Sequence, residues 1–233
     1  MASPSVKYLI IVPAYNAGKY LPELILRIKQ AAPASDILII NDGSLDNTFE
    51  IINNLKLPHI DNPNNRGKGC ALKGGFEYGI DNNYDYIITI DADLQHRPED
   101  IPRFIEKAGT ASIVIGTREI SSRTMSLARY ISNTMTSAIV SRFCGQRIRD
   151  SQSGFKMYST ELIKKMDIGS EKFDFETELL IQAGREKAKI AEIPIMTIHS
   201  GSSSNINHLA DTWRFIKLVW KYALGNKRIR GEV

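Results

Sequence analysis

Short apolar runs alternate with stretches of helical spacing along the first half of the chain. Each run has the length of a buried strand, and the stretches between the runs place apolar residues three and four positions apart, as on one face of a helix. The expected strands are Lys7–Val12, Ile37–Ile40, His59–Asp61, Tyr86–Ile90 and Ala111–Gly116. The expected helices are Leu21–Ala31, Phe49–Leu55, Ala71–Ile80 and Ile101–Ala108. This alternation predicts an α/β fold, with a mostly parallel sheet and helices on both of its faces.

The second half of the chain follows a less regular order. Its expected elements are a helix over Met125–Phe143, a strand over Phe155–Tyr158, a helix over Phe175–Lys187 and a strand over Ile190–Ile198. Because Pro194 has no N–H to donate, the last strand is expected at a sheet edge or with a bulge. Small polar residues at 201–205 predict a mobile loop that suits a lid. A final helix is expected from the apolar spacing of Leu209, Trp213, Ile216, Trp220 and Leu224.

Composition indicates one globular domain. A chain of 233 residues with 42% hydrophobic content is long enough to bury a good core. The net charge of +4 suits an anionic ligand or a membrane surface, and no nucleic-acid-reading motif accompanies it. The 2 cysteines form no disulfide framework, which favours a reducing compartment. Since the apolar runs fall short of the roughly 20 residues that span a bilayer, we expect a cytoplasmic protein, either free or peripheral on the cytoplasmic face of a membrane.

The strongest candidate site follows the apolar run Tyr86–Ile90. Asp91 and Asp93 come directly after this run, so that a buried strand delivers both carboxylates to the ligand-binding edge of an open sheet. Hard oxygen ligands suit Mg²⁺ or Mn²⁺, and these cations suit a diphosphate. The alternative is a surface turn whose aspartates cap the next helix. The position after a buried strand favours the metal site.

Two further loops are expected at the same edge of the sheet. Pro13 and Tyr15 follow the first strand and offer flat apolar surface to a nucleobase. Asp42 follows the second strand, and its carboxylate can accept hydrogen bonds from a base or a ribose. The alternative for Asn41–Ser44 is a plain tight turn, because these are turn residues. The convergence of three loops favours a nucleotide site.

The segment Asn65–Gly69 is the nearest feature to a phosphate loop. Arg66, Lys68 and the backbone amides suit a diphosphate at a helix start, although by itself the segment favours a plain loop with a Gly-rich helix start. The chain has no G-x-G-x-x-G after its first strand and no P-loop motif. It therefore carries no fingerprint of a dinucleotide-binding fold or of a P-loop NTPase.

Together these segments resemble the inverting family 2 glycosyltransferases, whose GT-A fold is a Rossmann-like, mostly parallel sheet with helices on both faces. The motifs that carry the resemblance are Val12–Asn16, Asn41–Ser44, Asn65–Gly69, Asp91–Pro98 and Gly116–Arg118. The later segments Arg149–Lys156 and Phe175–Glu178 make the chain similar to the polyprenyl-phosphate branch, which includes dolichyl-phosphate mannose and glucose synthases.

The resemblance implies a role for each matching position. The contacts to the donor nucleoside correspond to Pro13, Tyr15 and Asp42. The site of the divalent cation and the diphosphate corresponds to Asp91, Asp93 and Gln95. Basic positions that meet the phosphates of the donor and of the lipid acceptor correspond to Arg118 and Arg129. Ala17 and Asn133 depart from the family pattern, which leaves the nucleobase (uracil or guanine) and the acceptor contact open.

The acceptor decides whether the reaction needs a base. A lipid phosphate is already anionic near neutral pH, because its second pKa is about 6. A hydroxyl acceptor must lose a proton to a carboxylate. Asp150 is the preferred candidate and Glu176 the second, while the alternative for Asp150 is an ion-paired turn residue beside Arg147 and Arg149.

We therefore expect one glycosyltransferase catalytic domain over 1–233, with a nucleotide-sugar-binding half at 1–118 and an acceptor-binding half at 119–233. It would transfer a hexose from GDP-hexose or UDP-hexose to a polyprenyl phosphate, with Mg²⁺ or Mn²⁺ as cofactor. A second candidate is transfer to a sugar hydroxyl in polysaccharide or glycolipid assembly. An inactive nucleotide-sugar-binding subunit belongs to a different class, and a nucleotidyltransferase lacks the activating loop that it needs.

Membrane contact is the remaining expectation. In the C-terminal helix Trp213, Ile216 and Trp220 share one face, and the basic residues Lys227, Arg228 and Arg230 follow. Such a composition suits an anionic interface. The apolar stripe is alternatively part of the core. We expect either direct peripheral contact with a membrane or docking to a membrane-anchoring partner.

Overall fold

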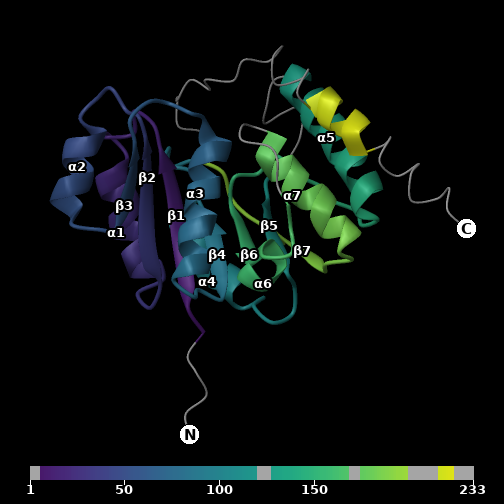
Figure 1. The fold of residues 1–233 in the computed structure, drawn as a ribbon, viewed down its shortest axis with the longest axis horizontal. Helices are drawn as coiled ribbons and strands as arrows, with labels where there is room; N and C mark the ends of the chain where they lie inside the picture. Colours follow the sequence, from purple (N-terminus) through teal and green to yellow (C-terminus); the bar gives the residue numbers. More distant parts are fainter. Residues whose placement is uncertain (1–5, 120–126, 168–173, 199–214, 223–233) are drawn as a thin grey trace, which may run out of the picture.

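The computed structural model describes residues 6–119, 127–167, 174–198 and 215–222 (Figure 1). Its centre is one seven-stranded sheet in the order β3-β2-β1-β4-β6-β5-β7. The strands are β1 (Tyr8–Ala14), β2 (Asp36–Asp42), β3 (His59–Asn62), β4 (Tyr86–Thr89), β5 (Ile113–Thr117), β6 (Lys156–Ser159) and β7 (Ile190–Pro194). β6 alone among them runs antiparallel to its neighbours, β4 and β5. The expectation of a mostly parallel sheet is confirmed.

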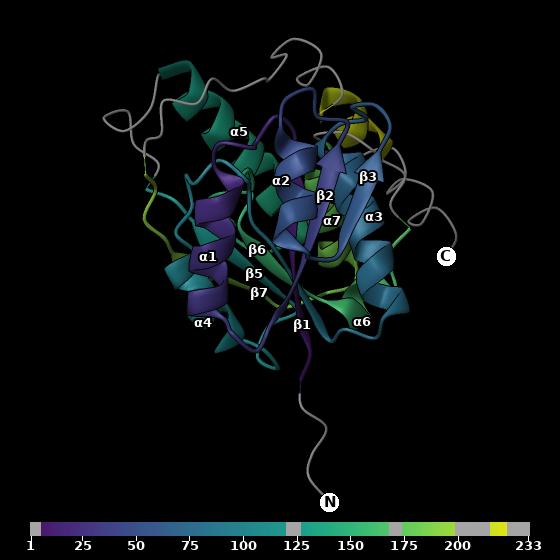
Figure 2. The same ribbon diagram turned by 90° about the vertical axis from the view of Figure 1, so that its left-hand side faces the viewer.

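Helices cover both faces of the sheet, as the alternation predicted. The helices are α1 (Leu21–Ala31), α2 (Thr48–Leu55), α3 (Lys68–Asp81), α4 (Ile101–Ile105), α5 (Leu127–Cys144), α6 (Thr160–Ile163) and α7 (Asp174–Arg185). A 3₁₀ turn, η1 (Pro98–Asp100), precedes α4. Figure 2 shows α1 and α4 on one side of the sheet and α3 and α6 on the other. The described part of the C-terminal helix, 215–222, packs on α7 and α5 through Leu218 and Tyr222.

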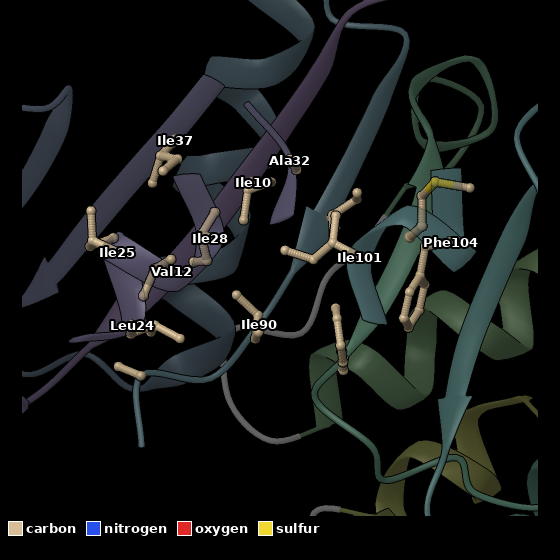
Figure 3. Packing of buried hydrophobic residues seen from close by; sticks show 14 of the residues in the cluster. Ile10, Val12, Leu24, Ile25, Ile28, Ala32, Ile37, Ile90, Ile101 and Phe104 are labelled. Atoms are coloured by element: carbon tan, nitrogen blue, oxygen red, sulfur yellow. The ribbon is translucent and has the colours of Figure 1, made fainter. Parts of the chain in front are cut away.

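The core consists of two apolar layers, one on each face of the sheet. Alternate residues of β1 point to opposite faces, so Ile10 and Val12 pack on α1 whereas Leu9 and Ile11 face α3. Figure 3 shows the first layer, in which Ile28 and Phe104 approach the sheet from α1 and α4. Because strands buried on both faces must be apolar throughout, these runs were visible in the sequence as continuous apolar segments.

The end of β7 differs from the expected strand over Ile190–Ile198. β7 lies at the edge of the sheet and stops at Pro194, as expected for a proline that cannot donate to a ladder. The chain then leaves the sheet and crosses the loop after β4. Thr197 forms an isolated bridge with His96, and Ile198 N donates to Gln95 O at 2.9 Å. The segment 195–198 therefore supports the Asp91–His96 loop.

The antiparallel β6 positions the candidate site. Since β6 enters the sheet where β4 ends, the segment 150–155 that precedes it lies against the loop that follows β4. Thr89 Oγ1 donates to Gly154 O at 3.0 Å and joins the two. β5 runs parallel to β4, so Arg118, which follows β5, emerges at the same edge.

Close approach of α5 and α7 generates a stability prediction. A Cβ built on Gly184 of α7 would collide with the Cα of Cys144 in α5, and backbone atoms cannot move aside as a side chain can. We expect Gly184→Ala to lower the free energy of unfolding by about 2 kcal/mol, measured by urea denaturation. The matched control is Gly74→Ala within α3, where the added Cβ meets nothing within 4 Å. That change should raise the free energy of unfolding by up to about 1 kcal/mol. Equal unfolding free energies for the two variants would contradict the close approach of α5 and α7 at Gly184.

Candidate active site

The loops after β1 and β2 are held together by side-chain hydrogen bonds. Asn16 adopts a left-handed backbone (φ 51°), its Oδ1 accepts from Leu45 N at 2.8 Å, and its N donates to Ser44 Oγ at 3.0 Å. Pro13 belongs to β1 and Tyr15 follows directly after it. The turn Asn41–Ser44 is therefore part of a fixed two-loop platform beside Pro13 and Tyr15.

Asp42 is buried at the end of β2 and organises the phosphate-loop candidate. Its Oδ1 accepts from Asn62 Nδ2 at 2.8 Å and from Arg66 N at 3.0 Å, and its Oδ2 accepts from Gly67 N at 2.7 Å. Gly67 needs its positive φ of 96° to make this turn, which L side chains seldom adopt. Hydrogen bonds thus join the loops that follow β1, β2 and β3.

The loop after β4 presents two carboxylates of different character. Burial opposes the charge of Asp91, but Lys68 outweighs it and lowers the pKa of Asp91 to about 2. Burial and the charge of Asp91 raise the pKa of Asp93, whose Oδ1 accepts from Gln95 N at 3.0 Å. Leu94, between Asp93 and Gln95, has a left-handed backbone (φ 59°) within the tight turn that this hydrogen bond closes.

A buried network of alternating charges surrounds Asp91. Lys68 Nζ lies 2.7 Å from Asp91 Oδ1 and 3.2 Å from Glu176 Oε2. Lys156, whose side chain is 0% exposed, donates to Glu176 Oε1 at 2.9 Å and also to Ser153 O. Burial opposes the charge of Glu176, but Lys156 and Lys68 outweigh it and lower its pKa. Two carboxylates and two ammonium groups therefore compensate one another.

Gly154 permits the close packing of this network. A Cβ at Gly154 would collide with Asp91 Oδ2 and would lie 2.7 Å from Lys68 Nζ. Any larger residue would push the Asp91–Lys68 pair apart. The glycine of the Arg149–Lys156 motif is thus explained by the proximity of the loop after β4.

Arg118 and Asp150 form a second ion pair at the same edge. Arg118 donates to Asp150 through Nε at 2.7 Å and through Nη2 at 2.9 Å, a bidentate arrangement. Asn133 Nδ2 of α5 also donates to Asp150 Oδ1 at 3.1 Å. Burial opposes the charge of Asp150, but the guanidinium outweighs it and lowers the pKa of this carboxyl. The partner of Asp150 is Arg118, while Arg149 instead lies 3.6 Å from Glu192.

His96 is a buried neighbour of Asp91. It is 3% exposed, its ring packs against Phe155, and its Nε2 lies 4.0 Å from Asp91 Oδ2. Burial lowers the pKa of His96 to about 4, so the ring is neutral near pH 7. Its Nδ1 is buried without a hydrogen-bond partner among the described residues.

The donor set at the end of β4 fits a hard divalent cation. Within the described residues, no group of three or more His, Cys, Asp and Glu side chains could hold a metal ion by itself. Asp91, Asp93 and Gln95 supply oxygen atoms only, and Mg²⁺ commonly takes one or two carboxylates together with substrate phosphates. In the structure Asp91 is paired with a positive charge, the Lys68 ammonium, at 2.7 Å.

The structure brings together most of the residues singled out from the sequence. Asp91, Asp93, Gln95, Lys68 and Arg118 lie at one edge of the sheet, and Arg66 lies in the loop that Asp42 holds. The side chain of Arg129 in α5 lies outside the described part of the chain, as do the 201–205 loop and Trp213.

Sequence reasoning missed Lys156 and Gly154. A lysine among the apolar residues of the expected strand Phe155–Tyr158 was the available signal, because a buried lysine needs a buried carboxylate. Its partner, Glu176, was considered only as a base.

The Arg118–Asp150 pair generates a prediction about stability and pH. Asp150→Asn leaves a largely buried guanidinium without its carboxylate, so the free energy of unfolding at pH 7 should fall by about 3 kcal/mol. Since the pKa of Asp150 is lowered in the folded state, its contribution is complete above the unfolded pKa of about 4 and is lost as the pH falls further. Chemical denaturation from pH 7 to pH 3 should show the two proteins converging at the acidic end.

The exposed pair of Glu161 and Lys165 provides the control for that measurement. Both side chains are mostly in solvent, at 82% and 54% exposure, so Glu161→Gln should leave the unfolding free energy unchanged. A loss in Glu161→Gln as large as that in Asp150→Asn would contradict the special role of the buried pair.

Several known proteins are similar in sequence to this chain over most of its length. The chain is 28% identical to undecaprenyl-phosphate mannosyltransferase of Micrococcus luteus, with 82% of this chain and 83% of the relative covered. It is 29% identical to polyprenol monophosphomannose synthase of Mycolicibacterium smegmatis, with 82% and 77% covered. It is also 29% identical to UDP-N-acetylglucosamine–dolichyl-phosphate N-acetylglucosaminyltransferase of Methanococcus voltae, with 82% and 85% covered.

Solved structures show the same fold. Glucosyl-3-phosphoglycerate synthase from Mycobacterium tuberculosis in complex with UDP superposes with a TM-score of 0.73 at 17% identity, over 94% of this chain and 80% of the other. The same enzyme with Mn²⁺, UDP-glucose and phosphoglyceric acid gives a TM-score of 0.72, over 95% and 79%. The GT-A fold expected from the resemblance is confirmed. The model of the family described as "Glycosyl transferase family 2" matches residues 9–167, and the chain therefore belongs to this family of glycosyltransferases.

Proposed function

We propose that this glycosyltransferase moves a hexose from GDP-hexose or UDP-hexose to a polyprenyl phosphate, with inversion at the anomeric carbon and with Mg²⁺ or Mn²⁺ as cofactor. The acceptor class is supported by the relatives, which are named as polyprenyl-phosphate or dolichyl-phosphate sugar transferases. In the reaction an oxygen of the acceptor phosphate forms a bond to the anomeric carbon while the bond from that carbon to the donor diphosphate breaks. The product is a lipid-linked β-hexosyl phosphate.

The donor half of the proposal comprises 1–118. Pro13 and Tyr15 would border the nucleobase, and Asp42 supports the loop whose Arg66 and Lys68 would meet the diphosphate. Asp91, Asp93 and Gln95 would hold the divalent cation, which when bound neutralises charge that develops on the departing diphosphate. Arg118 would add a positive charge at the same edge of the sheet.

One observation above all favours a phosphate acceptor over a hydroxyl acceptor. Both candidate bases are ion-paired: Asp150 with Arg118, and Glu176 with Lys156 and Lys68. Their pKa values are lowered, which makes each a weak base. An acceptor that is already anionic needs no strong base. We accordingly propose that Asp150 holds Arg118 in position. The acceptor would bind to 119–233, where Arg129 would meet its phosphate.

The membrane half of the proposal rests on exposed apolar side chains. In 215–222 the inward residues are Leu218 and Tyr222, whereas Ile216 is 41% and Trp220 is 63% exposed. On α5, Ile131 and Met135 are also exposed, at 47% and 59%. Figure 1 shows the C-terminal helix in yellow beside α5. Among the helices of the described residues, none has the length and apolar character needed to cross a bilayer.

We propose that these side chains contact the cytoplasmic face of a membrane, where a lipid acceptor would be reached, or a membrane-anchoring partner. Exposed Lys217 beside them suits anionic headgroups, whereas the ammonium of Lys221 lies 2.9 Å from Glu178 Oε1. Of the expected apolar stripe, Ile216 and Trp220 lie in the described segment and both are exposed, whereas Leu218 and Tyr222, which are not in that stripe, make the core contacts. Lys227, Arg228 and Arg230 lie outside the described residues.

Transfer of label from nucleotide hexoses tests the reaction. Purified protein, Mn²⁺ and a panel of GDP- and UDP-hexoses should yield a labelled product with polyprenyl phosphate and none with a neutral alkyl glycoside. Asp93→Ala should lower the rate by about 10²-fold or more, because the cation loses a carboxylate ligand. Asp81→Ala, at the exposed C-terminal end of α3, is a control that should retain activity. Transfer to the glycoside and not to polyprenyl phosphate would contradict a phosphate acceptor and would indicate a hydroxyl acceptor instead.

Liposome flotation tests the membrane contact. Trp220→Glu together with Ile216→Glu should reduce the fraction of protein bound to vesicles that contain anionic lipid, since a buried charge opposes insertion at an interface. The control is Leu26→Glu on α1, where the wild-type side chain is 57% exposed. Equal flotation of wild type and both variants would rule out direct contact through this helix.

A further inference from the structure

Lys68 occupies an unusual place for a cation. It is the first residue of α3, where the helix dipole is positive and where carboxylates rather than amines are favoured. Its side chain is only 23% exposed. Both features disfavour an ammonium, so its position depends on the two carboxylates that it contacts, Asp91 and Glu176.

The Lys68 ammonium contacts the Asp91 oxygen that Gly154 and His96 do not border. Gly154 packs against Oδ2 so closely that a Cβ there would collide with it, and His96 borders the same oxygen. Oδ1 remains, and Lys68 Nζ lies 2.7 Å from it. A divalent cation that used Asp91 would thus meet a positive charge on the very carboxylate that it requires.

Glu176 keeps Lys68 beside Asp91. Lys156 fixes Glu176 from the other side, with its own ammonium fully buried and bonded to Ser153 O as well. This arrangement holds Glu176 ionised and in place, so that Lys68 is shared between two carboxylates of different loops. The pair Lys156 and Glu176 therefore stabilises the form of the site in which Asp91 is already neutralised.

We propose that Lys68 is a built-in counter-cation of Asp91, which it leaves when a divalent cation and a nucleoside diphosphate bind together. This inference rests on the proposed function and adds to it the displacement of one positive charge, that of Lys68, by another. The diphosphate supplies the negative charge that receives the displaced ammonium, because Lys68 directly follows the Arg66–Gly67 amides at the start of α3. The cation and the diphosphate then depend on each other, while the cation alone binds against competition from Lys68.

Manganese binding measures this competition without any turnover. The concentration of free Mn²⁺ is followed by electron paramagnetic resonance in wild type and in Lys68→Met, with and without GDP or UDP. Lys68→Met should bind Mn²⁺ alone about tenfold more tightly, in line with the coupling between contacting charges. The nucleotide should tighten Mn²⁺ binding by a smaller factor in Lys68→Met than in wild type. In wild type part of that factor arises because the diphosphate draws Lys68 away from Asp91, and the variant has no such contribution.

The matched control is Lys73→Met, which removes the same charge from the same helix at a partly exposed position. It should bind Mn²⁺ as wild type does. A second measurement needs only wild type: the ¹⁵N-labelled ammonium signal of Lys68 should shift when Mg²⁺ and the nucleotide bind, and the Lys73 signal should not.

The outcomes separate the two proposals. Mn²⁺ binding that is unchanged or weaker in Lys68→Met, or a Lys68 signal that does not respond to bound Mg²⁺ and nucleotide, overturns the counter-cation and leaves the proposed function intact. Tighter binding in Lys73→Met equal to that in Lys68→Met also overturns it, because a general effect of net charge would then suffice. Absence of Mn²⁺ binding in every protein, with nucleotide present, overturns the proposed function and this inference with it.

Discussion

The antiparallel insertion of β6 between β4 and β5 is the constraint on which the site depends. Without it the segment 150–155 would not reach the loop after β4, and Gly154 could not lie against Asp91. The same insertion leaves β4 and β5 parallel, so the residues that follow them, Asp91 and Arg118, emerge at one edge. A single reversed strand therefore joins two halves of the chain around one cluster of charges.

Charge compensation is the second organising principle of this edge. Six of its ionisable groups form two clusters. In the first, the Lys68–Asp91 contact is extended by Glu176 and Lys156, and the second is the bidentate Arg118–Asp150 pair. Buried charges of one sign are costly, and opposite charges at hydrogen-bond distance offset that cost. Under the proposed function, an anionic donor and a cation would each replace a charge that is already present at this edge.

Much of the fold was predictable because its strands and helices are specified by short patterns of apolar and polar residues. Strands buried on both faces appear as apolar runs such as Ile37–Ile40, and α1 appears as the helical spacing of Leu21, Leu24 and Ile25. Pro194 predicted either an edge strand or a bulge, and β7 lies at the edge of the sheet. The direction of β6 was not predictable, since a short apolar strand carries the same pattern whichever way it runs.

By itself the sequence determined the layered α/β fold, the family, and the loops that carry Asp42, Asp91 and Arg118, because periodicity and motif spacing are local properties of the chain. Only the tertiary structure decided which charges meet. Lys68 and Glu176 are far apart in sequence, as are Arg118 and Asp150, and Lys156 is a solitary charge within a strand. Their pairing depends on strand order and direction, which arise from packing the whole sheet rather than from any one segment.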